Sequence, residues 1–175
     1  MKALAFRKAV TMDHSNFLDD VLGLLEEGGI RFCVIGGQAV NAYVEPLVSL
    51  DLDVVVAVEQ IDRARKLLEA RFHVEEFPHS LNVAATGSEL RVQIQTDPRY
   101  GDFVARASVR EVLGLPLPVA SLEDVLRGKI WTASDPTTRG RIRRKDLLDI
   151  ERILEAHPQL NTRVPRQILE CFSDN

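Results

Sequence analysis

Two carboxylates stand two residues apart at the start of an apolar run, Asp51-Leu52-Asp53-Val54-Val55-Val56. This run is typical of a buried strand, in which successive side chains point to opposite faces. Asp51 and Asp53 are therefore expected side by side on one face. Like charges at that separation repel each other unless a cation lies between them. Mg²⁺ suits this arrangement, because it takes one or two protein carboxylates and completes its coordination with water and phosphate oxygens.

A glycine pair precedes the carboxylates. The run Phe32–Ile35 indicates a short buried strand that ends at Gly36-Gly37 and turns into a helix, expected over Gln38–Tyr43. A backbone without Cβ atoms lets a triphosphate approach the N–H groups at the start of such a helix. Gly36 and Gly37 are therefore candidates for nucleotide binding.

The order of these features, a Gly-Gly pair, a helical spacer and an Asp-x-Asp, resembles the signature of the nucleotidyltransferase superfamily, the fold of DNA polymerase β and its minimal bacterial relatives. The resemblance implies an α/β (α+β) fold with a mixed sheet, flanking helices and a helical C-terminal portion. It implies that Asp51 and Asp53 bind Mg²⁺ and are catalytic, and that Gly36 and Gly37 hold the triphosphate of an NTP. Related proteins often have Ser or Thr just before the Asp-x-Asp, which makes Ser49 a further nucleotide-binding candidate.

The strand expected over 89–96 departs from the superfamily pattern. In the superfamily a third carboxylate on this strand completes metal binding and can activate the attacking hydroxyl. This chain has Gln93 or Gln95 there, and an amide carries no charge and cannot take a proton. Asp97 could substitute from the strand end, but Asp97-Pro98 is also a common start of a turn, and we favour the turn.

A second group of charged residues lies nearer the C-terminus. Lys129 falls in a helix that Ser121 is expected to cap, and a basic loop then leads to Lys145-Asp146-x-x-Asp149. These motifs resemble those of the AbiEii-like toxins, in which a helical Lys and a later Asp complete the active site. The resemblance implies that Lys129 and Asp146 are catalytic, that Lys129 also binds the nucleotide by neutralising phosphate charge, and that an antitoxin accompanies the protein.

The same residues have structural interpretations. A negative side chain is favoured near a helix start, where Asp146 lies, and Asp149 can pair with Lys145 or Arg152 along one helix. We interpret Asp149 as structural, and we interpret Lys129 and Asp146 as functional because of the resemblance. A dense basic run either flanks a polyanionic substrate or forms a solvated loop; it contains Arg139, Arg141, Arg143 and Arg144.

Composition narrows the class of protein. A chain of 175 residues with 45% hydrophobic and 27% charged residues suits one well-buried globular unit. A formal charge of −4 gives no general attraction to nucleic acid, so contact with RNA would need a local patch. No apolar run is long enough to cross a membrane, and we expect a cytoplasmic protein without a membrane partner. Cys33, Cys171 and the four histidines show no metal-ligand spacing.

The remaining periodicity predicts a mixed sheet with helices packed on it. Apolar residues at helical spacing indicate helices over 15–27, with Ser15 as the cap, over 59–71 and over 165–172. Residues 103–112 either continue the sheet or form a short helix. Four or five strands are expected, from the runs 32–35, 51–56, 74–77, 81–85 and 89–96.

A proline-punctuated stretch over 115–119 indicates an extended link. We place the domain boundary there, with a nucleotidyltransferase core over 1–114 and a helical C-terminal portion over 115–175, packed together as one compact unit.

The sequence thus favours a Mg²⁺-dependent enzyme that moves NMP from an NTP to a hydroxyl of RNA, protein or a small molecule. The alternative is a catalytically degenerate member of the same fold that binds nucleotide or a protein partner without chemistry. Gln93 and Gln95, in place of the third acid, motivate this alternative.

Overall fold

Short runs rich in Val, Ile and Leu pair into one seven-stranded sheet in the order β3-β4-β5-β2-β1-β7-β6. The computed structural model describes residues 16–138 and 140–173. Its strands are β1 (Phe32–Ile35), β2 (Asp51–Val56), β3 (His73–Phe77), β4 (Ser80–Ala84), β5 (Arg91–Gln95), β6 (Ser108–Val112) and β7 (Leu115–Val119). β2 runs antiparallel to β1 and parallel to β5, so the sheet is mixed, as the sequence predicted.

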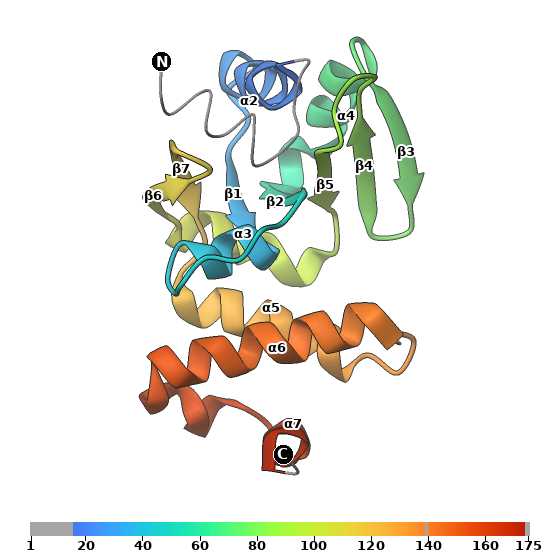
Figure 1. Ribbon diagram of the computed structural model, residues 1–175. Coiled ribbons are helices and arrows are strands. Elements are labelled where there is room, and N and C mark those ends of the chain that lie inside the picture. The colour runs from blue at the N-terminus through green and yellow to red at the C-terminus, as the bar shows by residue number, and fades with distance from the viewer. Residues whose placement is uncertain (1–15, 139, 174–175) are drawn as a thin grey trace.

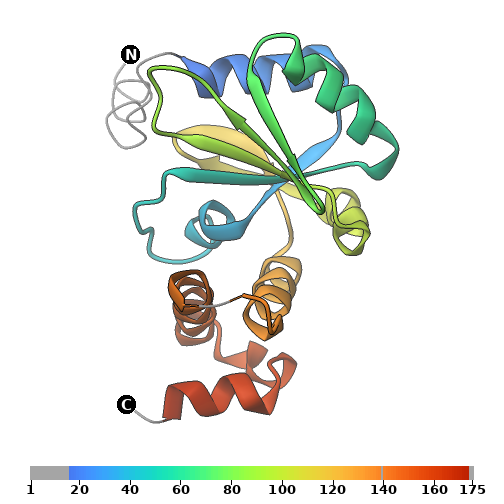
Figure 2. The same ribbon diagram turned by 90° about the vertical axis from the view of Figure 1, so that its right-hand side faces the viewer.

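Helices pack on both faces of this sheet. They are α2 (Phe17–Glu27), α3 (Gly36–Asn41), α4 (Ile61–Glu69), α5 (Leu122–Ser134), α6 (Gly140–Ala156) and α7 (Arg166–Ser173), with 3-10 segments η1 (Val58–Gln60), η2 (Pro98–Arg106) and η3 (Pro158–Arg163). Figure 1 shows α5 and α6 running past one end of the strands. In Figure 2, α2 and α4 cover one face of the sheet, and α3, α5, α6 and α7 lie on the other side. This arrangement confirms the predicted fold class.

Helical periodicity explains how the first face is covered. The buried residues of α2 recur at helical spacing and turn one stripe toward the sheet. Phe17 on this stripe meets the ring of Phe72 edge to face, with centroids 5.2 Å apart. Ser15, the expected cap, lies outside the described residues, and Asn16 occupies the N-cap position. The expected helix over 59–71 is present as η1 followed by α4.

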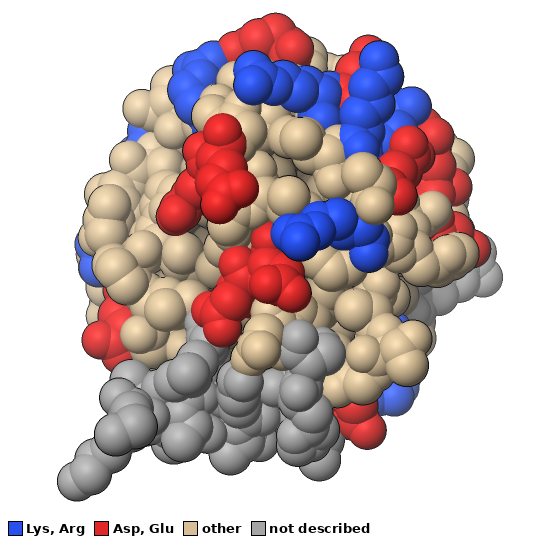
Figure 3. All heavy atoms as spheres, turned by 90° about the horizontal axis from the view of Figure 1, so that it is seen from above, with Lys and Arg blue, Asp and Glu red and all other residues tan. Residues whose placement is uncertain are grey.

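The exposed side of α2 and α4 is charged. Seen from above in Figure 3, acidic and basic side chains lie among one another on this face. Arg65 of α4 pairs with Asp62 and with Glu76 of the neighbouring β3. Such a surface of mixed charges is typical of a solvated helix face.

The sheet is larger than the four or five strands expected, because residues 108–119 form a hairpin. Leu113 and Gly114 make its tight turn, with φ of 52° and 77°. The prolines at 116 and 118 led us to predict an extended link, and that prediction was wrong. Successive N–H groups of a strand point to opposite edges, so alternate prolines remove donors from one edge only, and β7 still pairs with β1 and β6.

The C-terminal helices begin after this strand. The Ser121 hydroxyl oxygen accepts a hydrogen bond from the N–H of Asp124 at 3.2 Å, which confirms the predicted cap of α5. Residues 103–112, for which helix and strand were both open, divide between η2 and β6. The division at residue 114 stays a prediction, and the first helix of the C-terminal portion starts at Leu122. Over the described ranges, no helix has the length and apolar character needed to cross a membrane.

Candidate active site

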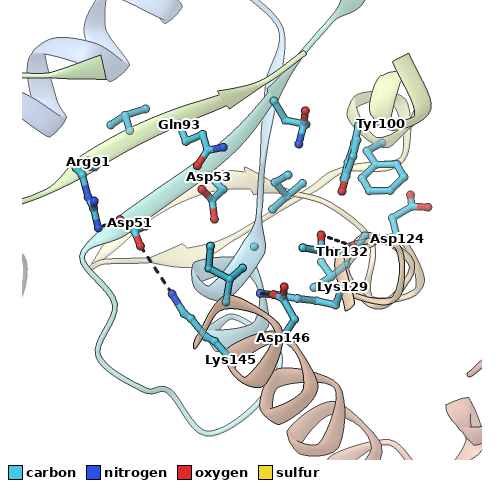
Figure 4. A pocket seen from close by; sticks show the side chains of 18 of the residues that line it. Asp51, Asp53, Arg91, Gln93, Tyr100, Asp124, Lys129, Thr132, Lys145 and Asp146 are labelled. Atoms are coloured by element: carbon cyan, nitrogen blue, oxygen red, sulfur yellow. Dashed lines mark hydrogen bonds and ion pairs between the residues drawn. The ribbon is translucent and has the colours of Figure 1, made fainter. Parts of the chain in front are cut away.

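A cavity of about 590 Å³ opens between the sheet and the helices α5 and α6. Its volume is in the range of small-molecule sites. Figure 4 shows charged and polar side chains converging on it from two sides. One side is the sheet wall, made by β2 and β5, and the other is the helical wall, made by α5 and α6. The lining includes Asp51, Asp53, Arg91, Gln93, Lys129, Thr132, Arg141, Lys145 and Asp146.

Asp51 and Asp53 both line this cavity, as the strand alternation predicted, while Leu52 and Val54 between and beyond them are buried on the opposite face. Asp51 lies at the mouth, with its side chain 34% exposed. The Arg91 guanidinium lies 3.0 Å from one of its carboxylate oxygens and Lys145 Nζ lies 3.8 Å from the other. Two cations of the protein therefore share the outer carboxylate.

Asp53 lies deeper. Burial raises the pKa of Asp53 to about 6, Lys129 opposes this shift, and the neighbouring charge of Asp51 adds to it. Among the described residues Asp53 forms no ion pair. A divalent cation between Asp51 and Asp53 would relieve this unfavourable charge, so the pair fits Mg²⁺. Among the described residues, no three or more acidic, histidine or cysteine side chains are placed to hold a metal ion together, so water and substrate phosphates would have to complete the coordination.

The two glycines of the pair differ. Gly36 has a φ of +67°, and a Cβ atom there would lie 2.2 Å from Oδ2 of Asp53. Glycine is required at position 36 because the Asp53 carboxylate occupies the space beside it. A Cβ on Gly37 would meet Ser49 Oγ at 3.7 Å, which is ordinary contact. Binding of a triphosphate at Gly36, Gly37 and the buried Ser49 stays a prediction.

Lys129 joins α5 to α6 in the helical wall. Its Nζ lies 2.8 Å from an oxygen of Asp146 and 2.8 Å from an oxygen of Asp149, and all three side chains are less than 10% exposed. Burial lowers the pKa of Lys129, but the two carboxylates outweigh burial and hold that pKa above its usual value. The structure thus brings Lys129 and Asp146 together as a charged pair.

Asp149 belongs to the same cluster, although it lies outside the cavity lining. Its second oxygen accepts a hydrogen bond from Arg152 at 2.8 Å, so the pairing with Arg152 that we considered is present. The alternative partner, Lys145, reaches across the cavity to Asp51 instead. Asp149 thus pairs with Lys129 and Arg152 at once, and its structural role stays a prediction.

The amides of β5 occupy the place expected for the third acid. Gln93 is the register partner of Asp53, and Gln93 and Gln95 both line the cavity. Asp97 lies outside the cavity lining, caps η2 by accepting a hydrogen bond from the N–H of Arg99 at 2.9 Å, and pairs with the guanidinium of that residue. The turn interpretation of Asp97 is confirmed.

The expected basic loop is wrong, because residues 141–144 lie in the first turns of α6. Arg141 lines the cavity, whereas Arg143 donates to the backbone oxygen of Ala133 at 3.1 Å and ties α6 to the end of α5. Arg144 is exposed, and Arg139 lies outside the described residues.

Two features of the cavity were missed by sequence reasoning. Arg91 lies opposite Asp51 in the parallel pairing of β2 with β5, and this neighbour relation needs the strand order. Tyr100 of η2 lines the cavity and meets the rings of Phe103 and Trp131 edge to face, with centroids 5.1 and 5.2 Å away. No local motif marks either residue, because both reach the site through tertiary packing.

Known proteins resemble the chain in sequence family and in fold. The family model described as nucleotidyl transferase AbiEii toxin, type IV toxin–antitoxin system, matches residues 24–174. No curated protein matches the sequence.

Three solved structures share the fold. The antibiotic-resistance factor ANT(2″)-Ia is 14% identical, with a TM-score of 0.55 over 96% of this chain and 98% of that one. The lincosamide antibiotic adenylyltransferase LnuA, bound to lincomycin, is 14% identical, with a TM-score of 0.52 over 79% of this chain and 97% of that one. An antigenic nucleotidyltransferase-like protein from Paracoccidioides brasiliensis is 15% identical, with a TM-score of 0.53 over 97% of this chain and 86% of that one. The match over residues 24–174 spans most of the sequence, and the chain therefore belongs to the nucleotidyl transferase AbiEii toxin family.

Proposed function

We propose that the chain is a Mg²⁺-dependent nucleotidyltransferase that moves NMP from an NTP to a hydroxyl group. The observation that supports this most strongly is the pair of carboxylates on one face of β2, which lies across a cavity from the Lys129–Asp146 pair. One wall offers ligands for a cation, and the other holds the ammonium group of Lys129 in a fixed position. A nucleoside triphosphate needs both, because its reaction concentrates negative charge on phosphate oxygens.

In this proposal the acceptor oxygen forms a bond to the α-phosphorus while the bond from that phosphorus to pyrophosphate breaks. Bound Mg²⁺ would neutralise phosphate charge, with Asp51 and Asp53 as its protein ligands. Lys129 supplies further positive charge, and Asp146 orients its ammonium group. The hydroxyl proton leaves to a carboxylate of the cavity, because the amide of Gln93 cannot accept it.

Calorimetric titration of each NTP, with and without Mg²⁺, tests this proposal. We expect binding that requires the metal and is lost in the Asp51→Ala/Asp53→Ala variant. Asp62→Ala is the matched control, because its side chain is 84% exposed on α4 over the opposite face of the sheet. A folded protein that binds no NTP under any of these conditions would contradict the proposal.

The acceptor and the physiological role are parts of the same proposal. ANT(2″)-Ia in complex with adenylyl-2″-tobramycin illustrates this fold with a small-molecule acceptor, and RNA or protein acceptors remain alternatives. The name of the family supports a toxin with an accompanying antitoxin and, with NTP as substrate, a cytoplasmic site of action. Incubation with labelled NTP and separated RNA, protein and metabolite fractions would identify the acceptor.

Gln93 favours a second candidate, a binding protein without catalysis. It stands in register with Asp53 and offers the cavity an amide where an acid would take a proton. In that case NTP would bind without turnover, and Gln93→Asp would create labelling that the parent chain lacks. Labelling by the parent chain that Asp53→Ala abolishes would exclude this candidate.

A further inference from the structure

The position of Asp51 depends on the segment that precedes it. Residues 42–50, here named the connecting segment, join α3 to β2 without a helix or strand of their own. The side chains of Ala42, Tyr43 and Val44 pack against the core, but those of Leu47 and Val48 are 49% and 80% exposed, so packing contributes little to fixing the middle of the segment. Ordering such a backbone costs entropy, which specific hydrogen bonds must offset.

Asn41, the last residue of α3, makes two of these hydrogen bonds. Its Nδ2 donates to the backbone oxygen of Leu47 at 2.6 Å, and its Oδ1 accepts from the N–H of Leu47 at 2.9 Å. Arg152 of α6 reaches the same place, because its Nη2 donates to Asn41 Oδ1 at 3.1 Å and to the backbone oxygen of Glu45. The connecting segment is thereby fastened to α6.

The other side of the Arg152 guanidinium faces the helical wall. Its Nη1 donates to Asp149 Oδ1 at 2.8 Å, and the second oxygen of Asp149 lies 2.8 Å from Lys129 Nζ. The planar guanidinium can hold three acceptors at once in fixed directions, which a lysine ammonium on a flexible stem cannot reproduce. Arg152 is 13% exposed and lies outside the cavity lining, so it does not reach a bound substrate directly.

We infer that Arg152 is a positioning residue that fixes the connecting segment, and with it Asp51, relative to Lys129. This inference rests on the proposed function, because it assigns Arg152 to the same nucleotide site. Without the Arg152 contacts, arrangements with Asp51 displaced become populated. The apparent affinity for nucleotide then falls in proportion to the fraction of molecules that can still bind it.

Hydrogen exchange and nucleotide titration of Arg152→Met and Arg152→Lys test the inference. We expect the Leu47 amide to exchange about tenfold faster in both variants and Mg²⁺-dependent NTP affinity to fall about tenfold. Arg152→Lys keeps a positive charge beside Asp149 and so guards against a variant that fails to fold. Arg166→Met is the matched control, because Arg166 on α7 is 90% exposed and pairs only with Glu170 in the described chain.

A double-mutant cycle with Asn41→Leu separates positioning from helix packing. If Arg152 acts through the connecting segment, Asn41→Leu and Arg152→Met each weaken NTP binding and the double variant is little worse than either. Additive losses would overturn the inference, and so would unchanged Leu47 exchange or NTP affinity in Arg152→Met. A wild-type chain that binds no NTP would contradict the proposed function instead, while Leu47 exchange would still decide whether Arg152 fastens the segment.

Discussion

The sheet wall and the helical wall of the cavity hold their charges in different ways. On the sheet wall, the partly exposed Asp51 pairs with Arg91 at 3.0 Å and with Lys145 at 3.8 Å. Burial there raises the pKa of Asp53 to about 6. On the helical wall, Lys129 is enclosed by Asp146 and Asp149 at 2.8 Å. The sheet wall is therefore incomplete without a cation, whereas the helical wall is already compensated.

This difference assigns separate tasks to the two walls. Groups that are already paired need no reorganisation when substrate arrives, which is the condition for electrostatic stabilisation of a reaction. Groups that repel each other when ionised gain most from an added cation. We therefore expect changes on the helical wall to affect folding and turnover together, and changes on the sheet wall to affect metal and nucleotide binding more than folding.

The strongest test of this contrast is Lys129→Met compared with Lys145→Met. Removing Lys129 leaves Asp146 and part of Asp149 buried without their shared cation, which typically costs about 3 kcal/mol or more of stability. Lys145 is 49% exposed, and loss of its contact with Asp51 should change stability by less than about 1 kcal/mol. Urea denaturation measures both values. Equal losses would show that the helical wall is not the more tightly paired one.

Gly36→Ala and Gly37→Ala compare the two glycines beside the sheet wall. The new methyl group at position 36 would lie where the Asp53 carboxylate lies, in a left-handed backbone conformation, so Asp53 must move. We expect Mg²⁺-dependent NTP affinity to fall about 100-fold, because a ligand of the metal is displaced. Gly37→Ala meets only ordinary protein contacts and leaves Asp53 in place, so it should lower affinity by less than about tenfold, through the Cβ atom placed beside the triphosphate. Calorimetric titration measures both affinities, and similar losses in the two variants would contradict the steric argument.

The same two walls show what the sequence could and could not predict. Alternation along β2 placed Asp51 and Asp53 on one face, because strand geometry is local. That Lys129 and Asp146 act together was predicted only from the family resemblance. Local sequence patterns do not indicate this contact, because it forms where α5 packs against α6. Arg152 and Glu45 are 107 residues apart in sequence, and no local pattern indicates such a contact.

The size of the sheet illustrates a different limit. Prolines at alternate positions of β7 contradict ordinary strand propensity, and pairing with β1 and β6 overrides that propensity. Gln93 and Gln95 were correctly predicted to lie on a strand, and the place of that strand beside β2 was implied by the family resemblance. Arg91 lies two residues before Gln93 on the same strand. Its contact with the cavity was not predicted, because that contact depends on Asp51, the residue opposite it on β2.

Asp53→Asn in metal-free protein provides a smaller and pH-dependent test of the sheet wall. The pKa of Asp53 is about 6 in the folded chain and near 3.8 in an unfolded one, so the wild type loses stability as pH rises from about 4 to about 6. An asparagine carries no charge to desolvate. We expect the variant to be more stable by about 2 kcal/mol at pH 8, and by much less near pH 4. Urea denaturation in a chelator at both pH values tests this, and a pH-independent difference would contradict it.

Arg91→Gln is the mildest test and asks whether the cations of the protein compete with a metal for Asp51. The Arg91 side chain is 70% exposed, so its ion pair with Asp51 contributes little to stability. Its removal should nevertheless free a carboxylate oxygen, and we expect Mn²⁺ to bind about two- to fivefold more tightly in the absence of nucleotide. Arg99→Gln serves as the control, since that guanidinium pairs with Asp97 at 2.8 Å, outside the cavity lining. Titration of Mn²⁺ followed by electron paramagnetic resonance measures the effect. Weaker Mn²⁺ binding in Arg91→Gln would mean that Arg91 orients Asp51 for the metal, and the sheet wall would then be organised before a cation arrives, like the helical wall.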